Sequence, residues 1–285
     1  MRFGSFQPVA DMLLYHNDMD QQLLELLDRF AGAAFDRQKR FDEFVAKKAP
    51  GAKKALDVEA GTLTFGPKLQ FEALLAGVHV DHNDSWMWTW SNRTIRVSLT
   101  NRALGDTIRA LAHKAMTPTF AKPAFPLDLI LGPDLTPHAV NVFGTILLGE
   151  LDYDAYWVAK HDGNPALFLI RDERLRTTEK HPLARILALF PKAMAALPVG
   201  DHRAAFFNYV HSYGFTPIED GAKSTLTVGK ATLTATFDDR GKLKSLKGEN
   251  VAAPKAKPAV PAKPQPKAKV KPKSKSKPKP KAKKK

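Results

Sequence analysis

The stretch GTLTFGPKLQFEALLAGVHVDHNDSWMWTW, residues 61–90, decides the fold class of this chain. Residues 61–65 and 69–73 alternate apolar and polar side chains, and the turn Gly66-Pro67-Lys68 separates them. Alternation over short runs bounded by Gly and Pro is typical of a β-hairpin. Residues 85–90 continue the alternation and predict a third strand, so the centre of the sequence is predicted to be antiparallel β-structure.

Helical spacing lies on both sides of this stretch. Apolar residues three or four apart predict a helix over residues 9–48, with a break at Gly32, and another helix entered near Thr100-Asn101. Thr136-Pro137 signals a helix start, because a hydroxyl caps the first turn and Pro needs no hydrogen-bond partner there. Two further helices are expected at residues 182–197 and 201–213.

More strands follow along the chain. Asp162-Gly163-Asn164 lies between the apolar runs 156–158 and 166–170, which is a strong hairpin signal. Residues 225–228, 231–237 and 242–246 predict a small meander. The fold class is therefore predicted to be α+β, with antiparallel hairpins and a meander packed against about five α-helices.

The net charge of +15 is unevenly distributed. Of the 44 Lys and Arg, 14 Lys lie in Val251–Lys285, which has no acidic residue; this leaves 30 basic against 29 acidic residues before it. We call Val251–Lys285 the basic tail. Its Lys, Pro and Ala composition buries little apolar surface and repels itself, so we expect no fixed structure there. The expected domains are a body over 1–248, divided into two subdomains near 116–135, and a disordered basic region over 249–285.

Composition excludes several classes of protein. The absence of Cys excludes disulfides, thiolate zinc sites and iron–sulfur clusters. No apolar run approaches the roughly 20 residues of a membrane-spanning helix, and the first residues do not form a signal peptide. The Walker, Rossmann, nucleophile-elbow, HExxH and EF-hand motifs are missing. We therefore expect a non-enzymatic cytoplasmic protein without a cofactor, and we assign no catalytic residue and no metal site.

The row Trp86, Trp88 and Trp90 is the most distinctive local feature. On a strand the three indoles share one face, which is either an aromatic floor for a planar ligand or a core layer under neighbouring helices. The turn His79-Val80-Asp81-His82-Asn83-Asp84 beside it contains metal-capable groups, but adjacent turn residues rarely converge on one ion. The candidate pocket comprises His79, His82, Trp86, Trp88, Trp90 and Asn92.

The stretch from Gly77 through Ser85–Asn92 resembles a bacterial family of unknown function, whose core is a glycine followed by W-x-W-x-W-A/S-N and a helix. Residues 156–170, Asp201–Ala204 and Phe237–Leu243 also look like that family, so the resemblance spans about residues 10–247. It departs from the family's pattern at Arg93, where a Pro is expected, and in the basic tail. The resemblance implies a fold and a bacterial cytosol, and supplies no catalytic residues.

The basic tail predicts a partner. Lysines on an extended chain bind polyanions by counterion release, and a tail without Arg or aromatic residues cannot read bases. We expect DNA or RNA as the partner, bound without sequence preference. The alternative is an extension without a dedicated partner, which either keeps the protein in solution or is attracted to an anionic membrane surface. For the body, a small-molecule or catalytic site on the Trp face and a protein–protein module remain open. The predicted polyanion-binding residues are Lys255, Lys257, Lys263, Lys267, Lys269, Lys271, Lys273, Lys275, Lys277, Lys279, Lys281, Lys283, Lys284 and Lys285.

Overall fold

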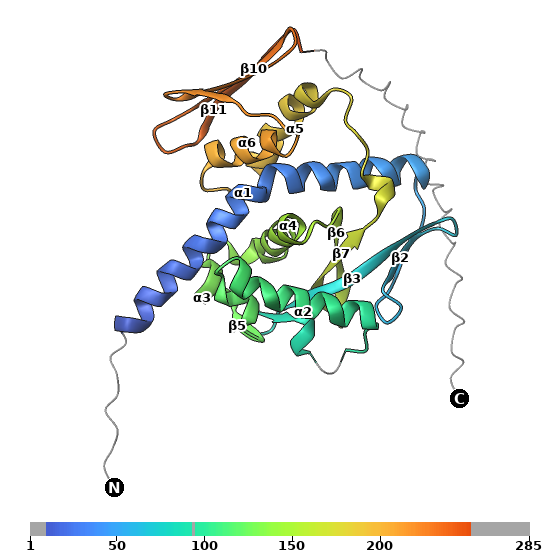
Figure 1. The fold of residues 1–285 in the computed structure, drawn as a ribbon. Helices are drawn as coiled ribbons and strands as arrows, with labels where there is room; N and C mark the ends of the chain where they lie inside the picture. Colours follow the sequence, from blue (N-terminus) through green and yellow to red (C-terminus); the bar gives the residue numbers. More distant parts are fainter. Residues whose placement is uncertain (1–9, 93–94, 252–285) are drawn as a thin grey trace, which may run out of the picture. The chain divides into compact units, whose positions relative to one another are not determined.

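A long helix, α1 (Ala10–Lys48), runs between two groups of elements (Figure 1). The computed structural model describes the backbone of residues 10–92 and 95–251, and the side chains of residues 21–92 and 95–251. Within these ranges it contains six α-helices and antiparallel sheets with eleven strands, so the fold is α+β as predicted. No helix in the described ranges is long and apolar enough to cross a membrane. Of the region predicted to be disordered, 249–285, residues 252–285 lie outside the described part, whereas Glu249 is the last residue of strand β11 (Leu243–Glu249).

The break expected at Gly32 is wrong. The α1 helix continues through this residue, although its axis changes direction part-way along in Figure 1. Gly32 serves a close approach instead: a Cβ there would lie 2.6 Å from Cβ of Tyr209 in α6 (His202–His211). The glycine therefore lets α6 pack directly against the backbone of α1.

The first sheet is organised around the twelve-residue strand β3 (Leu69–Val80). Both β2 (Thr62–Phe65) and β4 (Ser85–Trp88) pair with one edge of β3, at its two ends, and β7 (Asn164–Arg171) pairs with the other edge. The predicted hairpins are confirmed. The turn of the β6–β7 hairpin has positive φ at Asp162 and Gly163, as a two-residue turn requires. The outer strands are β1 (Lys54–Asp57), β5 (Ala124–Pro126) and β6 (Ala155–His161).

Both faces of this sheet are buried. Helices α2 (Leu99–Lys114), α3 (Leu127–Leu131) and α4 (Ala139–Leu151) share one core with Trp86, Trp88 and the first half of α1. The other face packs against the second half of α1 through Phe41. Burial on both faces explains why β7 is apolar at five consecutive positions rather than alternating.

The second sheet is a four-stranded meander with its own core. Its order is β11-β10-β9-β8, and it packs against α5 (Pro182–Ala196) and α6. The predicted helix starting at Asp201 is confirmed, because this side chain accepts hydrogen bonds from the N–H groups of Arg203 and Ala204. The strands are β8 (Ile218–Asp220), β9 (Lys223–Val228), β10 (Ala231–Phe237) and β11 (Leu243–Glu249).

The cores do not divide near residues 116–135, where two subdomains were expected. Residues on both sides of that stretch, such as Leu104 and Ile146, belong to one core. The core of the meander is formed with α5, α6 and Ala31 of α1, and takes no residue from 116–135. The stretch itself is less irregular than expected, because it holds β5, α3 and the 3-10 turn Pro118–Ala121. All described residues belong to one compact unit, Met1–Pro254, so a body ending at 248 would cut the last strand β11.

Thr136 does not cap its helix. A 3-10 turn, Thr136–His138, precedes α4, and the Thr136 hydroxyl donates to the carbonyl of Gly132. Pro137 lies at the start of this turn, where its missing N–H leaves no hydrogen bond unmade. This part of the predicted helix start is confirmed.

Candidate functional site

The three tryptophans separate into two environments. Trp86 and Trp88 lie on β4 and are completely buried, whereas Trp90 lies in the 3-10 turn Thr89–Ser91 and is partly exposed. The strand ends at Trp88, so the prediction of one row on one strand is wrong for Trp90. The core alternative describes Trp86 and Trp88, whose rings pack against Phe143 with centroid distances of 4.6 and 5.2 Å.

Gly77 explains how the buried indole fits. A Cβ at this position would lie 2.6, 2.7 and 2.8 Å from Cζ2, Cε2 and Nε1 of Trp86. The indole therefore lies directly on the backbone of β3, which is why a glycine and the tryptophan strand belong together in this part of the sequence. Trp88 is held differently, because its Nε1–H donates to the carbonyl of Thr119 at 3.1 Å.

A gap in the sheet lies beside Trp90. One edge of β3 pairs with β2 near its start and with β4 near its end. Leu75 lies between these two pairings, and its backbone faces no strand on that edge of β3. The buried side chain of Asn101 from α2 takes the place of a strand: its Oδ1 accepts from the Leu75 N–H and its Nδ2 donates to the Leu75 carbonyl, both at 2.7 Å. The Thr89 hydroxyl donates to the same carbonyl at 2.8 Å.

A cavity of about 460 Å³ lies over this gap, and we call it the Trp90 cavity. It is larger than the other cavities described in this structure, and its volume falls within the roughly 300–1,000 Å³ typical of small-molecule sites. Two of the predicted pocket residues, Trp90 and Asn92, contribute to it. The other lining residues are Thr89, Ile95, Val97, Asn101, Arg102 and Asp106.

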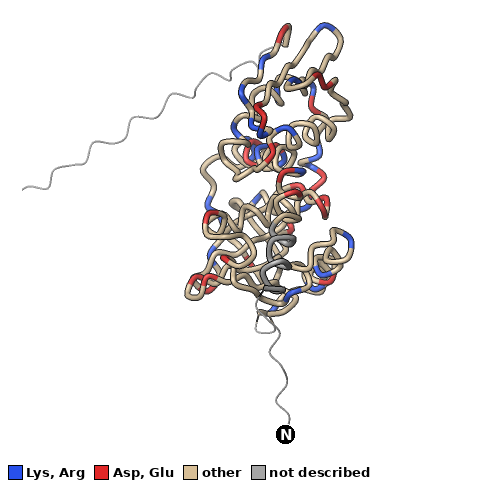
Figure 2. Tube along the Cα trace, turned by 90° about the vertical axis from the view of Figure 1, so that its left-hand side faces the viewer, with Lys and Arg blue, Asp and Glu red and all other residues tan. Residues whose placement is uncertain are grey.

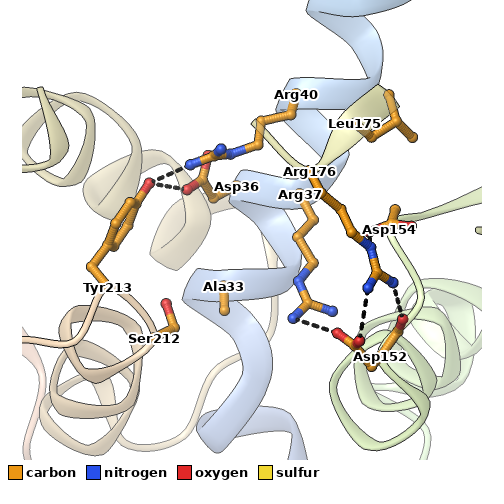
Figure 3. A pocket seen from close by; sticks show the side chains of 10 residues that line it. All are labelled: Ala33, Asp36, Arg37, Arg40, Asp152, Asp154, Leu175, Arg176, Ser212 and Tyr213. Atoms are coloured by element: carbon orange, nitrogen blue, oxygen red, sulfur yellow. Dashed lines mark hydrogen bonds and ion pairs between the residues drawn. The ribbon is translucent and has the colours of Figure 1, made fainter. Parts of the chain in front are cut away.

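A second cavity, of about 240 Å³, is more strongly charged (Figure 3). On one side Arg37 of α1 and Arg176 reach Asp152 at 3.2 Å each. On the other side the buried Asp36 carboxylate accepts from Tyr213, and Arg40 donates to the same phenol at 2.9 Å. Burial, followed by the Asp36 charge, raises the pKa of Tyr213 above its ordinary value of 10.0, so this phenol stays a donor.

The arginines of the second cavity are engaged by the protein itself. Arg37 also donates to the carbonyls of Leu148 and Tyr153, which satisfies the end of α4, and Arg40 donates to Thr177. The Asp36 carboxylate also accepts a hydrogen bond from the Arg185 side chain of α5. This network ties α1 to the elements on both of its sides, so its chemistry accounts for assembly of the fold rather than for ligand binding.

A match to the family of unknown function DUF6882 covers residues 24–173, more than half of the chain. The chain belongs to DUF6882. The resemblance to an uncharacterised family, inferred from the tryptophan stretch, is thereby confirmed. No curated protein and no solved structure matches the chain.

The DUF6882 match contains one of the two cavities and only part of the other. Every residue that lines the Trp90 cavity lies inside the matched range, as do Gly77 and Leu75. The second cavity draws Arg176, Ser212 and Tyr213 from beyond it. The stretches at 201–204 and 237–243, which also looked like the family, lie outside the match.

The histidine turn of this DUF6882 member does not form a pocket with the tryptophans: His79 pairs with Trp86 between β3 and β4, but the Trp86 side chain is completely buried. His79 Nε2 lies 2.6 Å from Asp84 Oδ1, and His79 Nδ1 lies 3.9 Å from Asp81 Oδ1. The side chain of His82 is exposed. In the described ranges no group of three His, Cys, Asp or Glu side chains is placed to hold a metal ion. The candidate pocket therefore reduces to Trp90 and Asn92, joined by residues of α2 that the sequence did not point to.

His202 provides a prediction about pH. Its Nδ1 accepts from the Leu243 N–H at 3.2 Å, and burial, together with nearby Lys242, lowers the pKa of this imidazole below its ordinary value of 6.5. The unfolded chain then binds more protons than the folded one just below pH 6.5, so the stability contributed by His202 is complete above 6.5 and is lost as the pH falls through the folded pKa.

We therefore expect the difference in unfolding free energy between the wild type and His202→Gln to shift against the wild type as the pH falls below 6.5. Thermal or urea unfolding between pH 5 and 8 measures it, with His138→Gln at an exposed position as the control. A difference that stays constant over this range would show that His202 titrates alike in both states.

Proposed function

We propose that this protein is a non-enzymatic polyanion-binding protein, in which the basic tail associates with nucleic acid without sequence preference. The observation that carries the proposal is the partition of charge. The tail holds 14 Lys and no acidic residue, whereas the rest of the chain is almost neutral, with 30 basic and 29 acidic residues. The proposal places the electrostatic attraction in the tail and leaves the body a separate role.

The charges of the body support this division. Six arginines of the body form ion pairs with its aspartates or glutamates. They are Arg37, Arg40, Arg174, Arg176, Arg185 and Arg203. In Figure 2 the basic and acidic residues lie interspersed along the described chain rather than gathered by sign. Interspersed, paired charges produce little long-range field, so the body contributes little steering toward a polyanion.

The chemistry of the tail favours binding without base recognition. Lysine ammonium groups act as point charges on phosphates, while bidentate contacts to guanine need arginine and stacking needs aromatic rings. The tail has no Arg and no aromatic residue. Its affinity should therefore come from released counterions and depend steeply on salt.

The salt dependence of binding tests this mechanism. Fluorescence anisotropy with two duplexes of unrelated sequence should give equal affinities for the full-length protein. If six to ten lysines contact phosphates, the affinity should fall by about 10³–10⁵ between 50 and 200 mM salt. An affinity insensitive to salt, a strong preference for one duplex, or preferential binding to vesicles of anionic lipid in competition with DNA would contradict the proposal.

A further inference from the structure

The Trp90 cavity combines an apolar wall with a polar one. The indole of Trp90 and the partly buried side chains of Ile95 and Val97 form the apolar part. Arg102 and Asp106 on α2 supply opposite charges at its rim. Sites for small molecules typically pair an apolar lining with a few polar groups that fix the orientation of the ligand.

The apolar wall is rigidly mounted. A Cβ on Gly105 of α2 would lie 2.7 Å from Cβ and 3.3 Å from Cα of Trp90, so the turn carrying Trp90 sits directly against the helix backbone. The Arg109 guanidinium lies 5.4 Å from the centre of the indole ring, in a cation–π contact. A wall held in this way loses little conformational freedom when a ligand packs on it.

The charged rim is available to a ligand. Arg102 and Asp106 are four residues apart and therefore project from the same side of α2. Both side chains are exposed, and neither makes a hydrogen bond or ion pair with any residue that the structure describes. In this they differ from the arginines of the second cavity, which are engaged by the protein.

We propose that the Trp90 cavity binds a small zwitterion with an apolar side chain, the chemistry of a free α-amino acid. The guanidinium of Arg102 offers two parallel N–H donors to a carboxylate, and the Asp106 carboxylate accepts from an ammonium group. An α-amino acid carries both groups on one carbon, with its side chain directed away from them toward Trp90. This site is independent of the basic tail and of polyanion binding.

Titration of the full-length protein with L-phenylalanine and L-leucine, followed by tryptophan fluorescence, tests the proposal. Trp90 is partly exposed while Trp86 and Trp88 are fully buried, so Trp90 should report occupancy. We expect a saturable change with at least one of the two amino acids. Trp157, which is also partly exposed, is changed to Phe to isolate the signal.

The variants Arg102→Gln and Asp106→Asn should each weaken binding at least tenfold, and N-acetyl-phenylalanine amide, which lacks both charges, should bind at least tenfold more weakly than L-phenylalanine. Arg96→Gln, at an exposed position that does not line the cavity, should bind like the wild type.

Because the changed residues are exposed, circular dichroism melting curves of the variants and the wild type should coincide. No saturable change with either amino acid, equal binding of the uncharged analogue, or unaltered affinity in both cavity variants would overturn the proposal.

Discussion

Replacing Gly77 with alanine should lower the free energy of unfolding by about 1–3 kcal/mol, the usual cost of overpacking a filled core. The added methyl group would lie 2.6–2.8 Å from three atoms of the Trp86 indole, and Trp86 is fully buried against Phe143. Since Gly77 pairs with Trp88 on one edge and Leu167 on the other, its backbone cannot shift without disturbing two strands.

A double-mutant cycle with Trp86→Phe separates this clash from a general intolerance of side chains at position 77. Phenylalanine lacks the outer ring of the indole, so Gly77→Ala should cost less in the Trp86→Phe background, with a coupling free energy of about 0.5–3 kcal/mol. Urea unfolding of the four proteins measures this. Strictly additive costs would mean that the contact between Gly77 and the indole does not set the packing.

Asn101→Leu should be the second strongly destabilising change. It removes the only acceptor that the described residues offer to the buried N–H of Leu75, and an orphaned buried donor costs about 1–3 kcal/mol. The Leu75 carbonyl keeps the Thr89 hydroxyl as donor. The loss therefore falls on the N–H of Leu75 alone, at the gap between β2 and β4.

Thr89→Val is the matched comparison for Asn101→Leu. It removes the other side-chain hydrogen bond to Leu75 while Asn101 still satisfies both the N–H and the carbonyl. Its cost should therefore be clearly smaller than that of Asn101→Leu in equilibrium unfolding. Equal costs, or a larger one for Thr89→Val, would show that Asn101 does not replace a strand at this edge.

Turn chemistry and periodicity made most of the elements predictable. Asp162-Gly163 adopts the positive φ angles that its residue types favour, and Asp201 caps α6 as its side chain allows. These signals are local, because a few neighbouring residues determine the backbone conformation. The same local logic failed at Gly32, where the glycine serves contact with Tyr209 from a distant helix.

The candidate site was predictable only in part. The alternation Trp86-Met87-Trp88-Thr89-Trp90 continues past the end of β4, and nothing in its period indicates that the strand stops at Trp88. Asn101 and Arg102 reach the site through the packing of α2 on the edge of β3, which depends on tertiary structure. The spacing of four residues between Arg102 and Asp106 is visible in the sequence, but by itself it does not distinguish a ligand site from an exposed helix face.

From the partition of charge we expect polyanion binding to belong to the basic tail and not to the body. The direct test compares the full-length protein with a variant in which all 14 tail lysines are changed to Gln, and with residues 1–254, which retain every described strand and no tail lysine. The measurement is the affinity for duplex DNA at 50 mM salt. We predict that the full-length protein binds, and that the other two lose at least about 10³-fold in affinity, as expected when several phosphate contacts vanish. Binding by residues 1–254 equal to that of the full-length protein would contradict the account.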